Sequence, residues 1–265
     1  MLAPIILLLI ALGLVAGSFG AVLGLGGGVI LVPVLALLGF PIRTAIGAGL
    51  VCVIATSAAA AGVYVERRWV DIRLGMLLEL GTVAGAISGA LLVTRLPDTL
   101  LKGLFGVFLL YAAVLLGRRT PAEAEEITDT QPEYRVRNYP LGIGVSYAAG
   151  SVSGLLGIGG GPIQVPLMYL GMGVPLKMAA ATSNFIMGVT AAAGAFLYYG
   201  RGEVVVGLTA PLVLGVFLGA QVGSRLARRV RSRIVQLLLI LVLLGLALLM
   251  LAEAFGYTAP WRGAR

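Results

Sequence analysis

Histidine is absent from this chain of 265 residues, and cysteine occurs only once, at Cys52. A single cysteine permits no disulfide within the chain. Without histidine, neither a His/Cys metal site nor a histidine general base can be built. We therefore expect no catalytic residues, no bound metal and no cofactor.

Charge is scarce as well, because 11% of the residues are charged whereas 59% are hydrophobic. A soluble domain carries roughly 25% charged residues. Several apolar runs reach the roughly 20 residues that cross a bilayer. The composition predicts an all-α integral membrane protein that crosses the bilayer several times.

The net charge of +8 does not point to nucleic acid. The basic residues lie in short connections between apolar runs, where positive charge fixes the orientation of membrane helices. They form no basic domain. We expect a lipid bilayer around the protein and no nucleic-acid partner.

One glycine-rich phrase occurs twice. Residues 17–33 read GSFGAVLGLGGGVILVP and residues 150–166 read GSVSGLLGIGGGPIQVP, with matching glycines and final prolines at an offset of 133. After one inserted residue the match continues at an offset of 134, where Tyr64 meets Tyr198 and Arg67 meets Arg201. The chain is therefore an internal duplication.

The duplication divides the chain into a first membrane repeat (1–117), a polar linker (118–138), a second membrane repeat (139–254) and a tail (255–265). Each repeat contains five apolar pieces. We expect helices at about 3–23, 29–39, 43–64, 72–95 and 98–117, and at about 139–156, 162–172, 176–199, 203–227 and 232–254.

The second piece of each repeat is too short to span. About 11 residues make roughly 16 Å of helix, which is half a bilayer. Each piece follows a glycine-rich break, so we predict a half-helix shielded by protein. If the broken pair returns to its starting side, the repeats are inverted and the basic residues split 13 to 6 between the faces; parallel repeats would give 9 to 10. Positive-inside bias favours inversion, with both termini outside and the linker cytoplasmic.

The glycine motifs are candidate parts of a binding site. Neither copy has nucleotide-binding spacing. Glycines let the backbone turn, and free N–H groups at a helix start attract anions. Paired helix breaks of this kind are typical of transport sites. The candidates are Gly26, Gly27 and Gly28 with their partners Gly159, Gly160 and Gly161. The alternative is close helix packing, which we expect for Gly85-x-x-x-Gly89 and Gly219-x-x-x-Gly223.

Polar residues gather around the second break only. Gln164, Thr182, Ser183 and Asn184 stand where the first repeat has Leu31, Ala48, Gly49 and Leu50. Polar side chains are costly in lipid and usually face the interior of a helix bundle. These four residues are candidates for substrate binding. Hydrogen bonds between helices are the alternative, above all for Thr182 and Ser183.

Two further groups of charged residues could contribute. Glu79 lies inside an apolar piece and is a candidate for proton coupling, unless it lies near the interface. Arg43, Lys177, Arg67 and Arg201 form repeat-matched pairs at helix ends and could give both mouths of the protein a positive rim for anions. Ordinary topology signals explain the same four residues. We assign Tyr64, Trp69, Tyr198 and Tyr199 to an interfacial aromatic belt.

The doubled G-x-G-G-G phrase, the following Pro33 and Pro166, and Ala-Thr-Ser-Asn at 181–184 resemble the TauE/SafE family of sulfite and sulfonate exporters. The resemblance covers residues 5–253. It implies an inner-membrane carrier that exports small sulfur-containing anions with help from the proton gradient. The first repeat departs from the pattern, because Ala48-Gly49 stands where the second has Thr182-Ser183. This difference favours a site weighted to the second repeat.

We thus expect a secondary transporter of a small anion, such as sulfite or an organosulfonate, that works by alternating access. A homodimer is left open. The alternatives are an intramembrane enzyme, for which nucleophiles and acids are scarce, and a non-transporting assembly subunit, which would leave the paired breaks unexplained.

Overall fold

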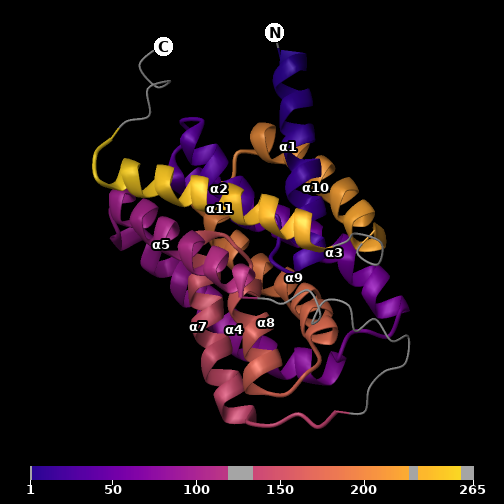
Figure 1. Ribbon diagram of the computed structural model, residues 1–265. Helices are drawn as coiled ribbons and strands as arrows, with labels where there is room; N and C mark the ends of the chain where they lie inside the picture. Colours follow the sequence, from indigo (N-terminus) through magenta and orange to yellow (C-terminus); the bar gives the residue numbers. More distant parts are fainter. Residues whose placement is uncertain (1, 119–133, 227–231, 258–265) are drawn as a thin grey trace.

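Each repeat folds into four long helices and a short one. The computed structural model describes residues 2–118, 134–226 and 232–257, and these ranges contain helices but no strands. The first repeat forms α1 (Leu2–Leu23), α2 (Gly28–Leu37), α3 (Ile42–Glu66), α4 (Ile72–Leu92), the 3-10 helix η1 (Val93–Arg95) and α5 (Asp98–Gly117) (Figure 1). The second forms α7 (Tyr139–Leu156), α8 (Gly161–Pro166), the π-helix η2 (Leu167–Gly171), α9 (Leu176–Gly200), α10 (Val206–Leu226) and α11 (Ser232–Ala254).

The prediction of an all-α membrane protein is confirmed. Seven of the described helices, α1, α3, α4, α5, α9, α10 and α11, are long and apolar enough to cross a membrane. α2 has only 10 residues, or about 15 Å of helix, which is half of a bilayer. Most of the predicted linker and tail lies outside the described residues.

Two pairs of helices pack together across the repeats. α1 of the first repeat packs along α10 of the second, and α7 packs along α4. Glycines make both contacts close: Gly85 packs against the carbonyl oxygen of Tyr147, and its twin Gly219 packs against that of Leu14. A Cβ atom at either glycine would collide with the oxygen. The expected close packing at the two G-x-x-x-G stripes is therefore confirmed.

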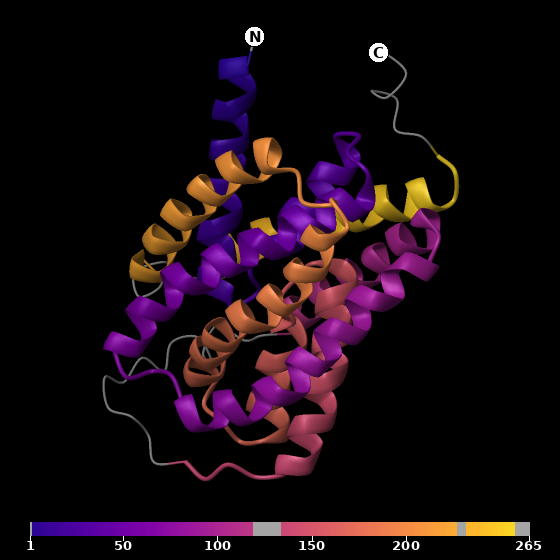
Figure 2. The same ribbon diagram turned by 180° about the vertical axis from the view of Figure 1, so that it is seen from behind.

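α3 and α9 occupy the middle of the molecule (Figures 1 and 2). They pack against each other, α3 also against α10, and α9 in the matching way against α4. The last helices of the two repeats, α5 and α11, form a further pair. Every major contact thus has a counterpart in the other repeat. Such pairing is what a two-fold relation between the repeats produces, while their inversion across the membrane stays a prediction.

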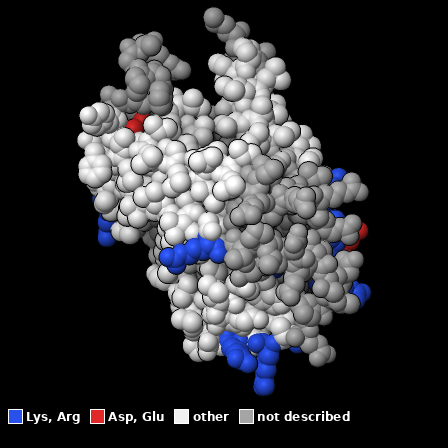
Figure 3. Space-filling view, in the orientation of Figure 1, with Lys and Arg blue, Asp and Glu red and all other residues white. Residues whose placement is uncertain are grey.

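Matched residues start the central helices. Pro41 and Pro175 precede α3 and α9 with nearly identical backbone angles (φ −53°, ψ 136° and 139°). Their fixed φ suits the position before a helix, where no N–H donor is needed. On the face seen in Figure 3, the basic side chains coloured there lie at the lower end and along the edges rather than in one patch.

Candidate substrate site

The two glycine-rich breaks meet at the centre of the molecule. Gly28 at the start of α2 packs against the carbonyl oxygen of Gly157, and Gly161 at the start of α8 packs against that of Gly24. A Cβ atom on Gly28 or Gly161 would collide with these backbone oxygens. The contact is reciprocal, so each loop needs a glycine where the backbone of the other loop packs against it.

The two loops follow the same path up to their third glycine. Gly24 and Gly157 have φ values of 70° and 75°, and Gly26 and Gly159 have 75° and 78°, a region that glycine enters without strain. The next pair differs. Gly27 is right-handed, with φ −65°, and donates its N–H to Thr56 Oγ1 over 3.4 Å, whereas Gly160 has φ 76°.

Protein atoms fill the space around the loops. The repeat-matched side chains Val53 and Met187 both pack against Gly26 and Gly159. The residues from Gly24 to Gly28 and from Gly157 to Gly161 are all buried. The predicted use of their N–H groups by an anion therefore requires the loops to move apart.

The predicted polar cluster lies on α9, beside these loops. Thr182, Ser183 and Asn184 are fully buried. The Asn184 side-chain amide donates to the carbonyl oxygens of Ala180 (3.0 Å) and Ala21 (3.5 Å), and Ala21 lies near the end of α1. Ser57 of α3 donates its hydroxyl to the Asn184 backbone oxygen over 2.5 Å.

Several polar atoms on α8 and α9 are buried and have no hydrogen-bond partner among the described residues. They include Asn184 Oδ1, Ser183 Oγ and Gln164 Oε1. Gln164 on α8 is only 1% exposed. Buried polar groups are nearly always satisfied, so a cluster of unsatisfied ones suggests that something else supplies the partners.

Thr182 connects the cluster to the loop before α4. Its hydroxyl oxygen accepts the backbone N–H of Asp71 over 3.0 Å. The Asp71 carboxylate caps α4 by accepting the N–H of Leu74 (3.0 Å), and it also accepts the hydroxyl of Tyr134 (2.6 Å). Burial and the hydrogen bond to Asp71 raise the pKa of Tyr134 above its usual range, so the phenol keeps its proton and donates the hydrogen bond to the carboxylate.

Glu79 lies on α4, partly exposed. Its Oε1 atom is buried and has no hydrogen-bond partner. One turn further along, Thr82 Oγ1 accepts the hydroxyl of Thr190 over 2.8 Å, which joins α4 to α9. The four helix-end cations form two groups.

The first group, which we call the Trp69 cluster, contains Arg67, Trp69 and Lys177. The Lys177 ammonium lies 3.5 Å from the centroid of the Trp69 ring, and the Arg67 guanidinium carbon lies 5.1 Å from it. Tyr64 stacks on the same ring, with the centroids 5.9 Å apart. Both cations thus converge on one indole, which can stabilise them through its π face.

The second group, which we call the Glu203 cluster, contains Arg43, Asp98, Arg201 and Glu203. Arg201 Nε lies 2.9 Å from Glu203 Oε2, and Arg43 Nε lies 3.4 Å from Asp98 Oδ1. Arg201 Nη1 also donates to the Ala90 carbonyl oxygen (2.8 Å). In this cluster each cation is paired with a carboxylate of the protein.

Two of the aromatic residues assigned to an interfacial belt are buried instead. Tyr64 and Tyr198 are 5% and 0% exposed, and their hydroxyl groups donate to Ala21 and Gly154 over 3.0 Å. Tyr199 is exposed. The belt interpretation was wrong for Tyr64 and Tyr198 because each phenol has a backbone acceptor inside the bundle.

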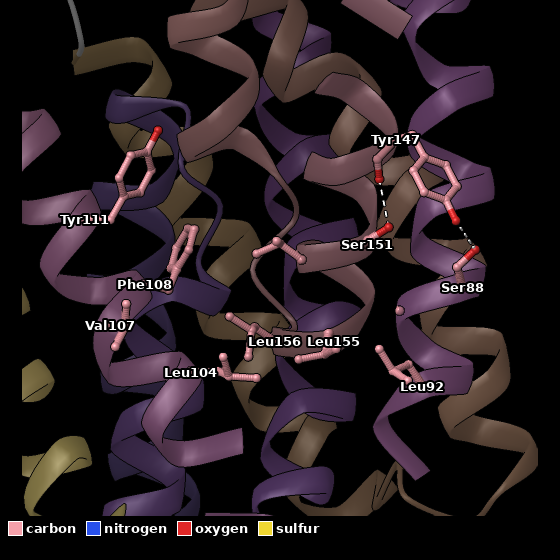
Figure 4. A pocket seen from close by; sticks show the side chains of 12 residues that line it. Ser88, Leu92, Leu104, Val107, Phe108, Tyr111, Tyr147, Ser151, Leu155 and Leu156 are labelled. Carbon is pink, nitrogen blue, oxygen red and sulfur yellow. Dashed lines mark hydrogen bonds between the residues drawn. The ribbon is translucent and has the colours of Figure 1, made fainter. Parts of the chain in front are cut away.

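A cavity of about 480 Å³ lies between α4, α5 and α7 (Figure 4). Its lining is almost entirely apolar. The polar groups of Tyr147, Ser88 and Ser151 bond within the wall, because Tyr147 donates to Ser88 Oγ (3.0 Å) and Ser151 donates to the Tyr147 carbonyl oxygen (2.9 Å). None of the predicted site residues lines this cavity.

Two residues that contact the candidate site were not among the predicted site residues. Ser57 donates to the backbone oxygen of Asn184, and Thr56 accepts the N–H of Gly27. The repeat offset contains a signal for Thr56, since Thr190 is its identical partner and both are buried. Ser57 has Ala191 as its partner and gave no such signal.

Residues 9–250 match the family described as "Sulfite exporter TauE/SafE". The chain belongs to the TauE/SafE family. It is 28% identical over 263 residues to the probable membrane transporter protein YunE of Bacillus subtilis, covering 91% of this chain and 96% of YunE. It is 31% identical over 252 residues to the probable membrane transporter protein ORF9 of Sinorhizobium sp, covering 94% and 93% of the two chains. No solved structure matches.

The family match and the names of these relatives make this TauE/SafE protein a multi-pass membrane transporter. The relatives' names give no substrate.

Proposed function

We propose that this protein is a secondary transporter that exports a small sulfur-containing anion, such as sulfite or an organosulfonate, across the cell inner (plasma) membrane. The buried polar residues of α9 carry this proposal. Ser183 Oγ and Asn184 Oδ1 have no hydrogen-bond partner among the described residues, and they lie on the helix whose Ala180 packs against Gly24 of the first break. A family described as sulfite exporters supports the substrate class.

The substrate is held on the second-repeat side of the crossing. Gln164, Thr182, Ser183 and Asn184 orient it, and the glycines at 26–28 and 159–161 contribute backbone N–H groups once the loops separate. Because Asn184 already donates to two carbonyl oxygens, its free atom is an acceptor. It therefore suits a hydrogen-bond donor on the substrate, such as the proton of hydrogensulfite or the ammonium of an aminosulfonate.

Transport proceeds by alternating access between inverted repeats, with both termini outside and the 118–138 linker in the cytoplasm. Glu79 carries the coupled proton. A homodimer is compatible with this mechanism and is not required by it.

Sulfite efflux from proteoliposomes tests the function directly. Asn184→Leu gives the second repeat the residue that the first has at Leu50, and we expect at least a tenfold loss of flux because a buried polar contact is removed. Val189→Leu on the exposed face of the same helix is the matched control and should transport normally. Equal flux in Asn184→Leu and wild type would exclude Asn184 from the site. Absence of anion flux in wild type would overturn the function.

A further inference from the structure

The Trp69 and Glu203 clusters occupy equivalent places in the two repeats. At the offset of 134, Arg67 corresponds to Arg201 and Arg43 corresponds to Lys177. Each cluster therefore contains one basic residue from the end of one central helix and one from the start of the other central helix, these helices being α3 and α9. Because of the duplication, the two clusters can be compared position by position.

The clusters differ in the residue that faces the cations. Position 203 is the counterpart of position 69, so the second repeat has a glutamate where the first has a tryptophan. Glu203 Oε2 lies 2.9 Å from Arg201 Nε and neutralises that guanidinium. Trp69 is uncharged and presents its aromatic ring to Arg67 and Lys177.

The charge of Arg67 is not paired with a carboxylate in the described part of the chain, whereas that of its counterpart Arg201 is paired with Glu203. The Arg67 Nη1 atom is buried and has no acceptor, and within the described part of the chain Arg67 makes no ion pair. Asp71, four residues further along the chain, makes no ion pair with Arg67; its carboxylate accepts hydrogen bonds from Tyr134 and from the N–H of Leu74. Arg201 also has one free N–H, at Nη2, but its charge is already paired.

We propose that the Trp69 cluster is a binding site for an oxyanion, which pairs with Arg67 as the Glu203 carboxylate pairs with Arg201 in the other repeat. Arg67 Nη1 donates to the anion, the Lys177 ammonium attracts it, and the Trp69 ring forms the wall. Carboxylate, sulfonate and sulfite groups share the charge and the acceptor geometry that this site selects. The Glu203 cluster is closed to external anions because the protein supplies its own.

Two series of contacts link the Trp69 cluster to the polar residues of α9. Asp71, two residues after Trp69, donates its N–H to Thr182 Oγ1. Tyr64, stacked on Trp69, donates to the same Ala21 oxygen that accepts from Asn184. The inference rests on the proposed function in one respect: it makes the Trp69 cluster the first contact of the transported anion. In the predicted topology this mouth is cytoplasmic, as export requires.

Tryptophan fluorescence tests the site in the full-length protein. The chain has two tryptophans, so Trp261→Phe leaves Trp69 as the single reporter. Purified protein in detergent is titrated with sulfite and with sulfate at constant ionic strength, set with chloride. We expect a saturable change in Trp69 emission. Arg67→Gln should weaken the apparent affinity about tenfold or more, the usual effect of losing a charged hydrogen bond.

The residue exchange suggested by the duplication is the decisive variant. Trp69→Glu places a carboxylate beside Arg67, and we expect it to abolish binding of radiolabelled sulfate, whereas the neutral Trp69→Gln retains part of it. Thermal unfolding of both variants identifies any folding defect. Glu203→Gln should leave the Trp69 titration unchanged. The inference is overturned if the emission change does not saturate, if Arg67→Gln titrates like the parent, or if folded Trp69→Glu binds sulfate as wild type does.

The two proposals fail separately. Sulfite flux in proteoliposomes without a response of Trp69 would refute the Trp69 site and leave the transport function standing. A saturable Trp69 response in a protein that moves no anion would support the site and refute the transport function.

Discussion

The hydroxyl group of Tyr64 donates a 3.0 Å hydrogen bond to the carbonyl oxygen of Ala21. Its twin Tyr198 donates in the same way to Gly154, the counterpart of Ala21. These bonds tie α3 to α1 and α9 to α7. Only the first is shared with the candidate site, because Asn184 also donates to Ala21.

Tyr64→Phe and Tyr198→Phe should therefore separate stability from transport. Each removes one buried hydrogen bond, so each should lower the free energy of unfolding by about 1 kcal/mol. Tyr64→Phe should also reduce sulfite flux, because Tyr64 then no longer holds in place the Ala21 carbonyl oxygen that accepts from Asn184. Tyr198→Phe should leave the flux unchanged. Thermal unfolding and proteoliposome flux measure the two effects. Equal flux in both variants would contradict the link between Ala21 and Asn184.

The crossing of the glycine loops makes a second prediction. Gly28→Ala and Gly161→Ala each place a methyl group against a backbone oxygen of the other loop. Backbone cannot give way as a flexible side chain can, so we expect little folded protein from either variant in size-exclusion chromatography. Gly62→Ala in α3 is the matched control. Nothing lies within 4 Å of the added methyl there, and alanine should stabilise the helix by about 0.5–1 kcal/mol. Normal yields of Gly28→Ala would show that the loops do not cross so closely.

Sequence reasoning predicted the helices well because their signals are local. Long apolar runs, glycine breaks and prolines such as Pro41 and Pro175 define where helices begin and end. The repeat offset also anticipated which glycines allow close packing. Gly85 and Gly219 contact backbone oxygens of opposite repeats, as twin residues in a duplicated fold should.

Contacts between distant segments could not be obtained in the same way. Nothing in the sequence shows that Gly28 meets Gly157 or that Tyr64 reaches Ala21. The first contact depends on how the two glycine-rich breaks cross, and the second on how α3 packs against α1. The sequence shows that Asn184 is polar, but it does not show which atom of the side-chain amide lacks a hydrogen-bond partner among the described residues. That answer comes from the carbonyl oxygens of Ala21 and Ala180.

Glu79 provides a test of proton coupling. Its Oε1 atom has no hydrogen-bond partner on α4, so a proton can be accepted there without breaking a bond. We expect Glu79→Gln to keep sulfite exchange but to lose stimulation of net flux by an imposed pH gradient. Asp98→Asn is the control, because that carboxylate is largely exposed at the start of α5. A gradient response in Glu79→Gln like that of wild type would remove Glu79 from the coupling mechanism.

An ion pair that no sequence pattern predicts joins the last helices of the two repeats. Lys102 Nζ of α5 lies 2.7 Å from Glu253 Oε2 of α11, with side-chain exposures of 16% and 3%. Breaking a buried ion pair by removing one partner is strongly destabilising, so Lys102→Met should lower the free energy of unfolding by about 3–5 kcal/mol. Lys102→Met combined with Glu253→Leu should recover much of this loss, because apolar side chains can replace both charges. The exposed Arg43–Asp98 pair is the comparison, and its loss through Asp98→Asn should cost about 1 kcal/mol or less. Thermal unfolding in detergent ranks the variants. A double variant no more stable than Lys102→Met would show that Glu253 stabilises α11 through other contacts.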